Sequence, residues 1–317
     1  MVMMGQSTSS GTAAAAAGTP AAPIEAGATP TAPAETTRRA GRSRRSPATS
    51  LLLHGTMIVA SLVAIGPIVW VLLSSFKPGY AVQSTSLTLV QDPTLTNYRY
   101  VLFDTNFLRW LLNSVLVAAG TMGIGIFLSA TTGYAVSRFN FPGRRPLMMV
   151  FLVTQMFPVA ILIVPIYTIM ARLGLINTLP SLVIAYLTIA VPFCAWMLKG
   201  YFDSIPTSLD EAAALDGCGP FATFWRVVLP LARPAVAVTA FYTFLTAWGE
   251  VAYASAFIQT DNQFTLAYGL RQFVPQYNPQ WEYLTAAAVL VTVPAGLVFM
   301  IAQRHLVSGL TAGGTKG

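Results

Sequence analysis

One short polar stretch lies between two long apolar ones and decides how this sequence folds: Pro206-Thr-Ser-Leu-Asp-Glu-Ala-Ala-Ala-Leu-Asp-Gly217. Ser208 and Glu211 have the spacing of a capping box, in which each side chain bonds a backbone N–H at the start of a helix. The alanines favour a helix, and Gly217 suits the residue just past its end. We therefore predict a helix of about eight residues, roughly 12 Å long. A helix this short needs a tertiary or intermolecular contact to be stable in water.

The residues around this helix are strongly apolar. Only 9% of the chain is charged and its mean hydropathy is +0.62, whereas soluble domains carry about 25% charged residues. Five stretches lack Asp, Glu, Lys and Arg, and a sixth contains one charge, Glu250. Each is near or above the length of a helix that spans a bilayer. The sequence thus predicts an all-α integral membrane protein with six transmembrane helices, within residues 56–76, 110–137, 146–171, 173–198, 234–257 and 283–303.

The segment that joins the short helix to the next apolar stretch has its own pattern. Its apolar residues recur at helical spacing before Pro230 and Pro234, which turn the chain. We expect this stripe to lie along the membrane surface, and its members are Phe221, Phe224, Trp225, Val227, Val228 and Leu229.

The basic residues predict the orientation of the helices. Thirteen of the 18 lysines and arginines fall on one side of the predicted membrane, beginning with a cluster between Arg38 and Arg45. Cytoplasmic loops are enriched in such residues, so both termini and the short helix are expected in the cytoplasm. Contact of the cluster with anionic membrane lipid is favoured, and a nucleic-acid-binding role is the weaker alternative.

Several kinds of chemistry lack their residues in this chain. The sequence contains no G-x-x-x-x-G-K-[ST] loop, so ATP phosphates are not bound here by that route. Two cysteines and two histidines indicate neither a disulfide framework nor a metal site. Within the apolar stretches there is no Ser/His/Asp or paired-carboxylate arrangement. We therefore expect no enzyme activity, cofactor or metal in this chain.

The sequence after the short helix resembles a known family. Glu211-Ala212-Ala213, three residues, Gly217, nine residues and then Val227-Val228-Leu229-Pro230 is similar to the EAA loop of ABC importer permeases. Only Val227 departs from that pattern, where it replaces isoleucine. The ending Gly309-Leu-Thr-Ala-Gly-Gly-Thr-Lys-Gly317 resembles that of MalG-type permease subunits of maltose/maltodextrin (carbohydrate) importers. The resemblance covers about residues 51–317 and implies the type I ABC importer permease fold (ABC transmembrane type-1).

The resemblance also implies a function and partners. The chain would be the permease subunit of an ATP-driven, binding-protein-dependent importer of maltose, maltodextrin or a related oligosaccharide in the bacterial cytoplasmic (plasma) membrane. Its partners would be a homologous second permease (MalF-like), an ATPase dimer (MalK-like) that binds ATP and Mg²⁺, and an extracytoplasmic sugar-binding protein. A permease for trehalose or glycerol phosphate is an alternative. An ion-coupled secondary transporter is a weaker one, because ionisable residues near the bilayer midplane and inverted repeats are not evident.

The same resemblance divides the chain and assigns its contacts. Residues 1–50 lie outside the resemblance and are expected to form a disordered cytoplasmic tail, because their start is rich in Ala, Thr, Pro, Ser and Gly and has little large apolar surface. Within the resemblance, 51–105 would form the first transmembrane helix and an outer segment, 106–304 the permease core and 305–317 a cytoplasmic C-terminal tail. The loop residues expected against the ATPase are Asp210, Glu211, Ala212, Ala213, Leu215 and Gly217, and those of the tail are Gly313, Gly314 and Lys316. Residues expected near the binding protein are Phe273, Gln276, Tyr277 and Asn278. Glu250 either lies on the transport pathway or is hydrated near the outer interface.

Overall fold

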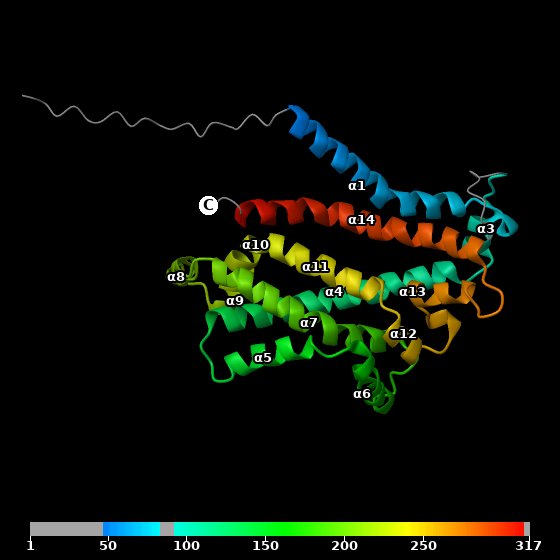
Figure 1. The fold of residues 1–317 in the computed structure, drawn as a ribbon. Coiled ribbons are helices and arrows are strands. Elements are labelled where there is room, and N and C mark those ends of the chain that lie inside the picture. Colours follow the sequence, from blue (N-terminus) through cyan, green and yellow to red (C-terminus); the bar gives the residue numbers. More distant parts are fainter. Residues whose placement is uncertain (1–46, 83–91, 314–317) are drawn as a thin grey trace, which may run out of the picture. The chain divides into compact units, whose positions relative to one another are not determined.

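The computed structural model describes residues 47–82 and 92–313, and every regular element in those residues is a helix (Figure 1). The basic cluster between Arg38 and Arg45, Gly314 and Lys316 lie outside the described residues. The elements are α1 (Pro47–Ser74), α2 (Gly79–Val82), α3 (Thr96–Phe103), α4 (Phe107–Arg138), α5 (Arg144–Thr154), α6 (Val159–Arg172), α7 (Leu179–Ser204), α8 (Ser208–Leu215), α9 (Pro220–Thr223), the π-helix η1 (Phe224–Val228), α10 (Leu229–Leu231), α11 (Arg233–Trp248), α12 (Ala252–Phe257), the 3₁₀ turn η2 (Asp261–Gln263), α13 (Leu266–Gly269), the 3₁₀ turn η3 (Leu270–Phe273) and α14 (Trp281–Gly313).

The chain divides into two compact units, residues 1–56 and 57–317. Only the first turns of α1 are described in the first unit, and all the remaining elements belong to the second.

The six predicted spans correspond to four single helices and two bent pairs. Helices α1, α4, α7 and α14 are long and apolar enough to cross a membrane. The pair α5 and α6 bends by 110°, and residues 220–231 bend by 82° into α11. With each bent pair counted as one span, the described residues contain six, as predicted.

Two spans are interrupted by a break in the helix. The stretch 146–171 breaks before Pro158, which has no N–H to donate and disfavours the helical conformation of the residue before it. The stretch 234–257 breaks between Trp248 and Ala252, and a new helix begins there. Helical periodicity alone does not reveal such breaks, because the apolar composition continues through them.

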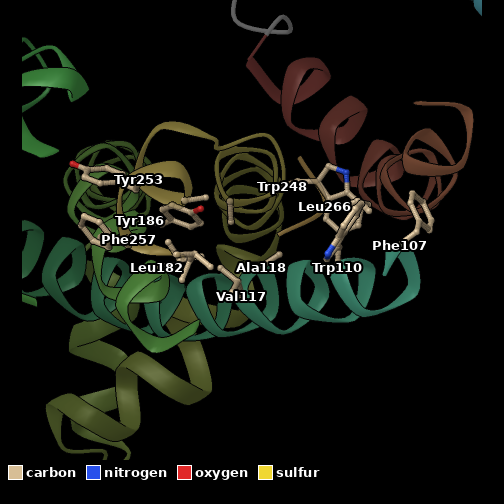
Figure 2. Close-up of a cluster of buried hydrophobic side chains, with 14 of the residues drawn as sticks. Phe107, Trp110, Val117, Ala118, Leu182, Tyr186, Trp248, Tyr253, Phe257 and Leu266 are labelled. Atoms are coloured by element: carbon tan, nitrogen blue, oxygen red, sulfur yellow. The ribbon is translucent and has the colours of Figure 1, made fainter. Parts of the chain in front are cut away.

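The core of the second unit forms around α4, which packs mainly against α7 and also against α11. Its largest buried cluster joins side chains of α4 and α7 to those of the short helices near the start of α4 (Figure 2). The labelled members are Phe107, Trp110, Val117, Ala118, Leu182, Tyr186, Trp248, Tyr253, Phe257 and Leu266.

At Gly133, α4 lies close against the backbone of α7. A Cβ atom there would lie 3.0 Å from the backbone N of Lys199 and 3.1 Å from the carbonyl O of Ala195. Gly120, Gly123 and Gly125, in the same helix, make no such contact with backbone. A Cβ at Gly123 would meet nothing within 4 Å, and at the other two it would meet only side chains. Small residues let membrane helices approach closely, and here Gly133 has that role.

Helix α1 is fastened to its unit near its C-terminal end. The buried Asn97 side chain donates from Nδ2 to the carbonyl oxygens of Ser75 and Lys77, each at 2.9 Å. The hydroxyl oxygens of Ser75 and Tyr98 lie 2.5 Å apart. In contrast, no residue in the most apolar 18-residue window of α1 is buried. The apolar surface of α1 is therefore open to lipid or to another subunit.

Gly133→Ala should lower stability, because the new methyl group meets the α7 backbone. The matched control is Gly123→Ala, which gains the same helix propensity in open space. Thermal unfolding in detergent should place Gly133→Ala about 1–3 kcal/mol below the control, as is usual for overpacking. Equal unfolding temperatures for the two variants would contradict the close contact.

Candidate functional site

The predicted short helix forms as α8, Ser208–Leu215, but its first turn differs from the prediction. Thr207 occupies the N-cap position, and its side chain makes no capping hydrogen bond. The N–H groups of Asp210 and Glu211 donate to the Thr207 carbonyl at 2.9 and 3.1 Å. The predicted capping box is therefore wrong: turn-type backbone bonds already satisfy the N–H groups that Ser208 was expected to bond.

The other end of α8 forms as predicted. Gly217 has a φ of +83°, in the left-handed region that favours glycine. Its N–H donates to the carbonyl of Ala214 at 3.0 Å, and the N–H of Cys218 donates to that of Ala213 at 2.9 Å. These two bonds form a Schellman motif, which ends the helix after a defined number of residues.

One face of α8 is anchored to α4 by a buried ion pair. Asp210 Oδ2 lies 3.0 Å from Arg138 Nε, and the two side chains are only 20% and 8% exposed. Tyr134, one turn earlier on α4, donates from its hydroxyl to Asp210 Oδ1 at 3.3 Å. Arg138 Nη2 also donates to the carbonyl of Ile205 at 3.0 Å. Removing one partner of a buried ion pair costs about 3–5 kcal/mol in general, because the other charge stays buried.

The opposite face of α8 is open. Leu215 is 90% exposed, and Glu211, Ala212 and Gly217 are exposed as well. Four of the six loop residues expected at a protein contact thus lie on an accessible surface. The other two face the bundle: Asp210 pairs with Arg138 and Ala213 is 6% exposed, so both hold α8 in place from its inner face.

The segment after α8 has the amphipathic character that its apolar stripe predicted. Phe224 and Val228 are buried in a second cluster with Tyr134, Leu198 and Phe202. Phe221 and Trp225 are exposed on the other side. A π-helix, η1, carries the chain through this segment before the 82° bend into α11. An interfacial helix next to a membrane typically presents one apolar and one exposed face in this way.

At the opposite end of α4, polar side chains hold the connection between α12 and α14 in place (Figure 1). The buried Asn113 donates from Nδ2 to the carbonyls of Asn262 and Phe264, each at 2.9 Å. Trp110 Nε1 donates to the Asp261 carbonyl at 3.1 Å, and the Asp261 carboxylate accepts from Asn106. Sequence reasoning missed these residues, although an amide such as Asn113 inside an apolar stretch could have indicated an anchor.

Within this connection, the four residues expected near a binding protein separate into two groups. Gln276, Tyr277 and Asn278 are exposed, and Tyr277 is 91% exposed. Phe273 differs from them, since it is 3% exposed and its ring packs edge-on against Trp110. The N–H of Gln280 donates to the Phe273 carbonyl at 2.8 Å, so the exposed loop is closed at its base.

Glu250 has a local structural role. Its Oε1 accepts a hydrogen bond from the Tyr253 N–H at 2.8 Å and its Oε2 accepts one from the Ala254 N–H at 3.3 Å. The carboxylate thus caps the N-terminus of α12, where negative charge is favoured. It lies in the break between α11 and α12, half-buried.

The C-terminal residues continue a helix instead of starting a separate tail. Helix α14 extends to Gly313, so the boundary expected after residue 304 does not coincide with the end of an element. Gly314 and Lys316 follow beyond the described residues.

Residues 122–312, which include α8 and its anchor, match the family described as "Binding-protein-dependent transport system inner membrane component". The chain belongs to this family. The "Maltodextrin transport system permease protein MalD" of Streptococcus pneumoniae is 36% identical over 85% of this chain and 96% of its own length. The "Maltose/maltodextrin transport system permease protein MalG" of Escherichia coli is 44% identical over 66% of this chain and 73% of its own length.

A solved structure shares the fold. A chain in the crystal structure of a bacterial ABC transporter for import of the acidic polysaccharide alginate matches 83% of this chain and 98% of its own length. The TM-score is 0.73 at 22% sequence identity. The predicted fold, an all-α membrane permease of the type I ABC importer kind, is therefore confirmed, and the chain is a multi-pass protein of the cytoplasmic membrane.

Asn113→Ala should loosen the connection between α12 and α14, because two carbonyl groups lose a buried donor. Leaving such groups unpaired typically costs about 1–3 kcal/mol, or roughly a 5-fold to 150-fold change in an opening equilibrium. Hydrogen exchange over residues 262–269 should accelerate accordingly. Asn278→Ala, in the exposed part of the same connection, should leave that exchange unchanged. Equal exchange rates in both variants would show that Asn113 is not the anchor.

Proposed function

We propose that this chain is the permease subunit of an ATP-driven, binding-protein-dependent importer of maltose, maltodextrin or a related oligosaccharide. Membership of the family supports transport, and the printed functions of MalD and MalG support this sugar class. The observation that carries the proposal is α8, a helix anchored on one face and open on the other at the end of the bundle. That arrangement suits a subunit that receives its driving force from another protein.

In this proposal, a separate ATPase dimer binds ATP and Mg²⁺ and hydrolyses the ATP. The exposed face of α8, with Glu211, Ala212 and Leu215, docks on that dimer. A helix of eight residues is marginal on its own, so Asp210 and Ala213 fix it in advance and reduce the ordering cost of docking. Closure of the ATPases then draws α8 inward and changes the relative populations of inward-facing and outward-facing states. Gly313, Gly314 and Lys316 extend the contact between the two ATPases.

The opposite end of the bundle meets the extracytoplasmic sugar-binding protein. Gln276, Tyr277 and Asn278 form its contact surface, because their amide and hydroxyl groups and the Tyr277 ring suit both protein and sugar surfaces. Phe273 supports this loop from beneath through its packing on Trp110. A second, homologous permease completes the pathway, and the open apolar surface of α1 provides one area for it to cover.

An ion-coupled secondary transporter is the main alternative mechanism. It would need an ionisable group placed to bind and release the coupling ion, and Glu250 is the carboxylate nearest to that requirement. Both oxygens of Glu250 instead accept backbone N–H bonds of α12. Because Glu250 is occupied by these backbone bonds, ATP coupling is favoured over ion coupling. Any role of Glu250 on the pathway is then limited to shaping the break between α11 and α12.

The test is uptake by the reconstituted complex, which contains both permeases, the ATPase and the binding protein. Maltotriose uptake into proteoliposomes should require ATP and binding protein and should persist in the presence of a protonophore. Trehalose and glycerol 3-phosphate serve as competing substrates. Uptake abolished by the protonophore but independent of ATP would overturn the proposal.

Orientation is tested with single cysteines at the two ends of the bundle, in a Cys218→Ser background that leaves only the buried Cys194. Leu215→Cys should react with a membrane-impermeant maleimide only in inside-out vesicles, because α8 faces the cytoplasm. Tyr277→Cys should react only in intact spheroplasts. The reverse labelling pattern would place the proposed ATPase contact outside the cell.

Leu215→Asp and Glu211→Ala should weaken binding of the ATPase without preventing membrane insertion. Substitution of a buried interface anchor typically costs about 1–3 kcal/mol, or roughly 5-fold to 150-fold in affinity. Co-purification of the ATPase with the two permeases measures this effect. Arg145→Gln, at an exposed position in the first turn of α5, is the control and should co-purify normally. Normal co-purification of all three variants would exclude α8 as the docking helix.

A further inference from the structure

We infer that Arg138 and Asp210 are positioning residues that make α8 and α4 move together, so that their ion pair sets how much ATP is hydrolysed per sugar transported. This inference rests on the proposed function and assigns a task to a pair that the EAA pattern does not contain. In the sequence, Arg138 is one of the thirteen basic residues on the predicted cytoplasmic side, and nothing near it in the chain indicates its partner.

The geometry places one side chain at the junction of three elements. Arg138 is the last residue of α4, its Nε meets Asp210 of α8 at 3.0 Å, and its Nη2 meets the carbonyl of Ile205, just after α7, at 3.0 Å. Tyr134, four residues earlier, donates to the other oxygen of the same carboxylate. Two successive turns of α4 therefore hold Asp210, which restrains α8 in direction as well as in distance.

Movement of α8 can enter the bundle through the ion pair or through packing with η1, whose Phe224 and Val228 lie in a buried cluster with Tyr134 of α4. The packing of α8 is mainly with α9 and η1, the segments that directly follow it in the chain. In contrast, α4 packs extensively against α7 and also against α11. A displacement of α8 that passes through Asp210 thus reaches the helix on which the core is built. Because the pair is buried, water and salt screen it weakly, and it can act as a stiff connection.

A second ion pair nearby provides a matched comparison. Lys199 Nζ lies 2.5 Å from Asp203 Oδ2, but these residues are one turn apart on α7 and their side chains are 34% and 41% exposed. Asp203 Oδ1 also accepts a hydrogen bond from Ser137 at 2.7 Å. Replacing Lys199 by Gln and Asp203 by Asn removes this pair and leaves an amide oxygen for Ser137. This double replacement should not alter how α8 moves.

Stability and coupling can be separated by changing both partners at once. Arg138→Gln or Asp210→Asn alone leaves one buried charge unpaired, which lowers the yield of assembled complex. The double variant, Arg138→Gln with Asp210→Asn, contains neither charge and can keep a neutral hydrogen bond, so its yield should recover. If the ion pair only stabilised the fold, the double variant would regain both assembly and coupling. We expect it to regain assembly but not coupling.

The experiment uses the complete complex in proteoliposomes and measures ATP hydrolysed per maltotriose imported. This ratio does not depend on how much complex is recovered. The double variant should assemble at wild-type levels and raise the ratio about tenfold, within the range of typical coupling between sites. The Lys199→Gln, Asp203→Asn control should keep the wild-type ratio.

Two results would overturn the inference alone. One is a wild-type ratio in the assembled Arg138→Gln, Asp210→Asn complex, and the other is failure of that double variant to assemble, since the pair would then serve folding. Absence of ATP-driven uptake by the wild-type complex would instead overturn the proposed function, and this inference with it.

Discussion

A single constraint organises this molecule: inside a bilayer, each backbone N–H and C=O group must find its partner within the protein. Long helices meet that requirement by themselves. Where a helix breaks, the backbone N–H groups at the break must find another acceptor or be absent. Before α6 the residue is Pro158, which has no N–H group. Before α12 the carboxylate of Glu250 accepts hydrogen bonds from two N–H groups. At the start of α7, the Asn177 side chain accepts from the N–H groups of Gln259 and Thr260.

The same constraint concentrates specific interactions at the two ends of the bundle. Along their length α4 and α7 associate through packing, and Gly133 meets the backbone of α7 near the end that carries α8. At one end, amide side chains such as Asn113 fix the connection that presents Tyr277. At the other, Arg138 joins α4 to α8. A rigid body with a fastened surface at each end is what communication between two sides of a membrane requires.

Sequence analysis predicted the features that depend on local residues. The spans followed from apolar composition, and α8 followed from its alanines and from Gly217, whose left-handed backbone ends the helix. The partners of α8 were not predictable in this way, because Arg138 and Asp210 lie far apart in the chain and only the fold brings them together. The burial of Phe273 was not predictable for the same reason: Gln272 and Val274 beside it are exposed, but its ring packs on Trp110 of α4.

Helix α1 has a consequence for biogenesis. It is fixed by Asn97 near one end, and the most apolar part of its length is unburied in this chain. In water such a helix would aggregate, but lipid tails are as apolar as its side chains and impose no hydrophobic penalty on it. The newly made subunit can therefore insert into the membrane and fold there before it assembles with other subunits.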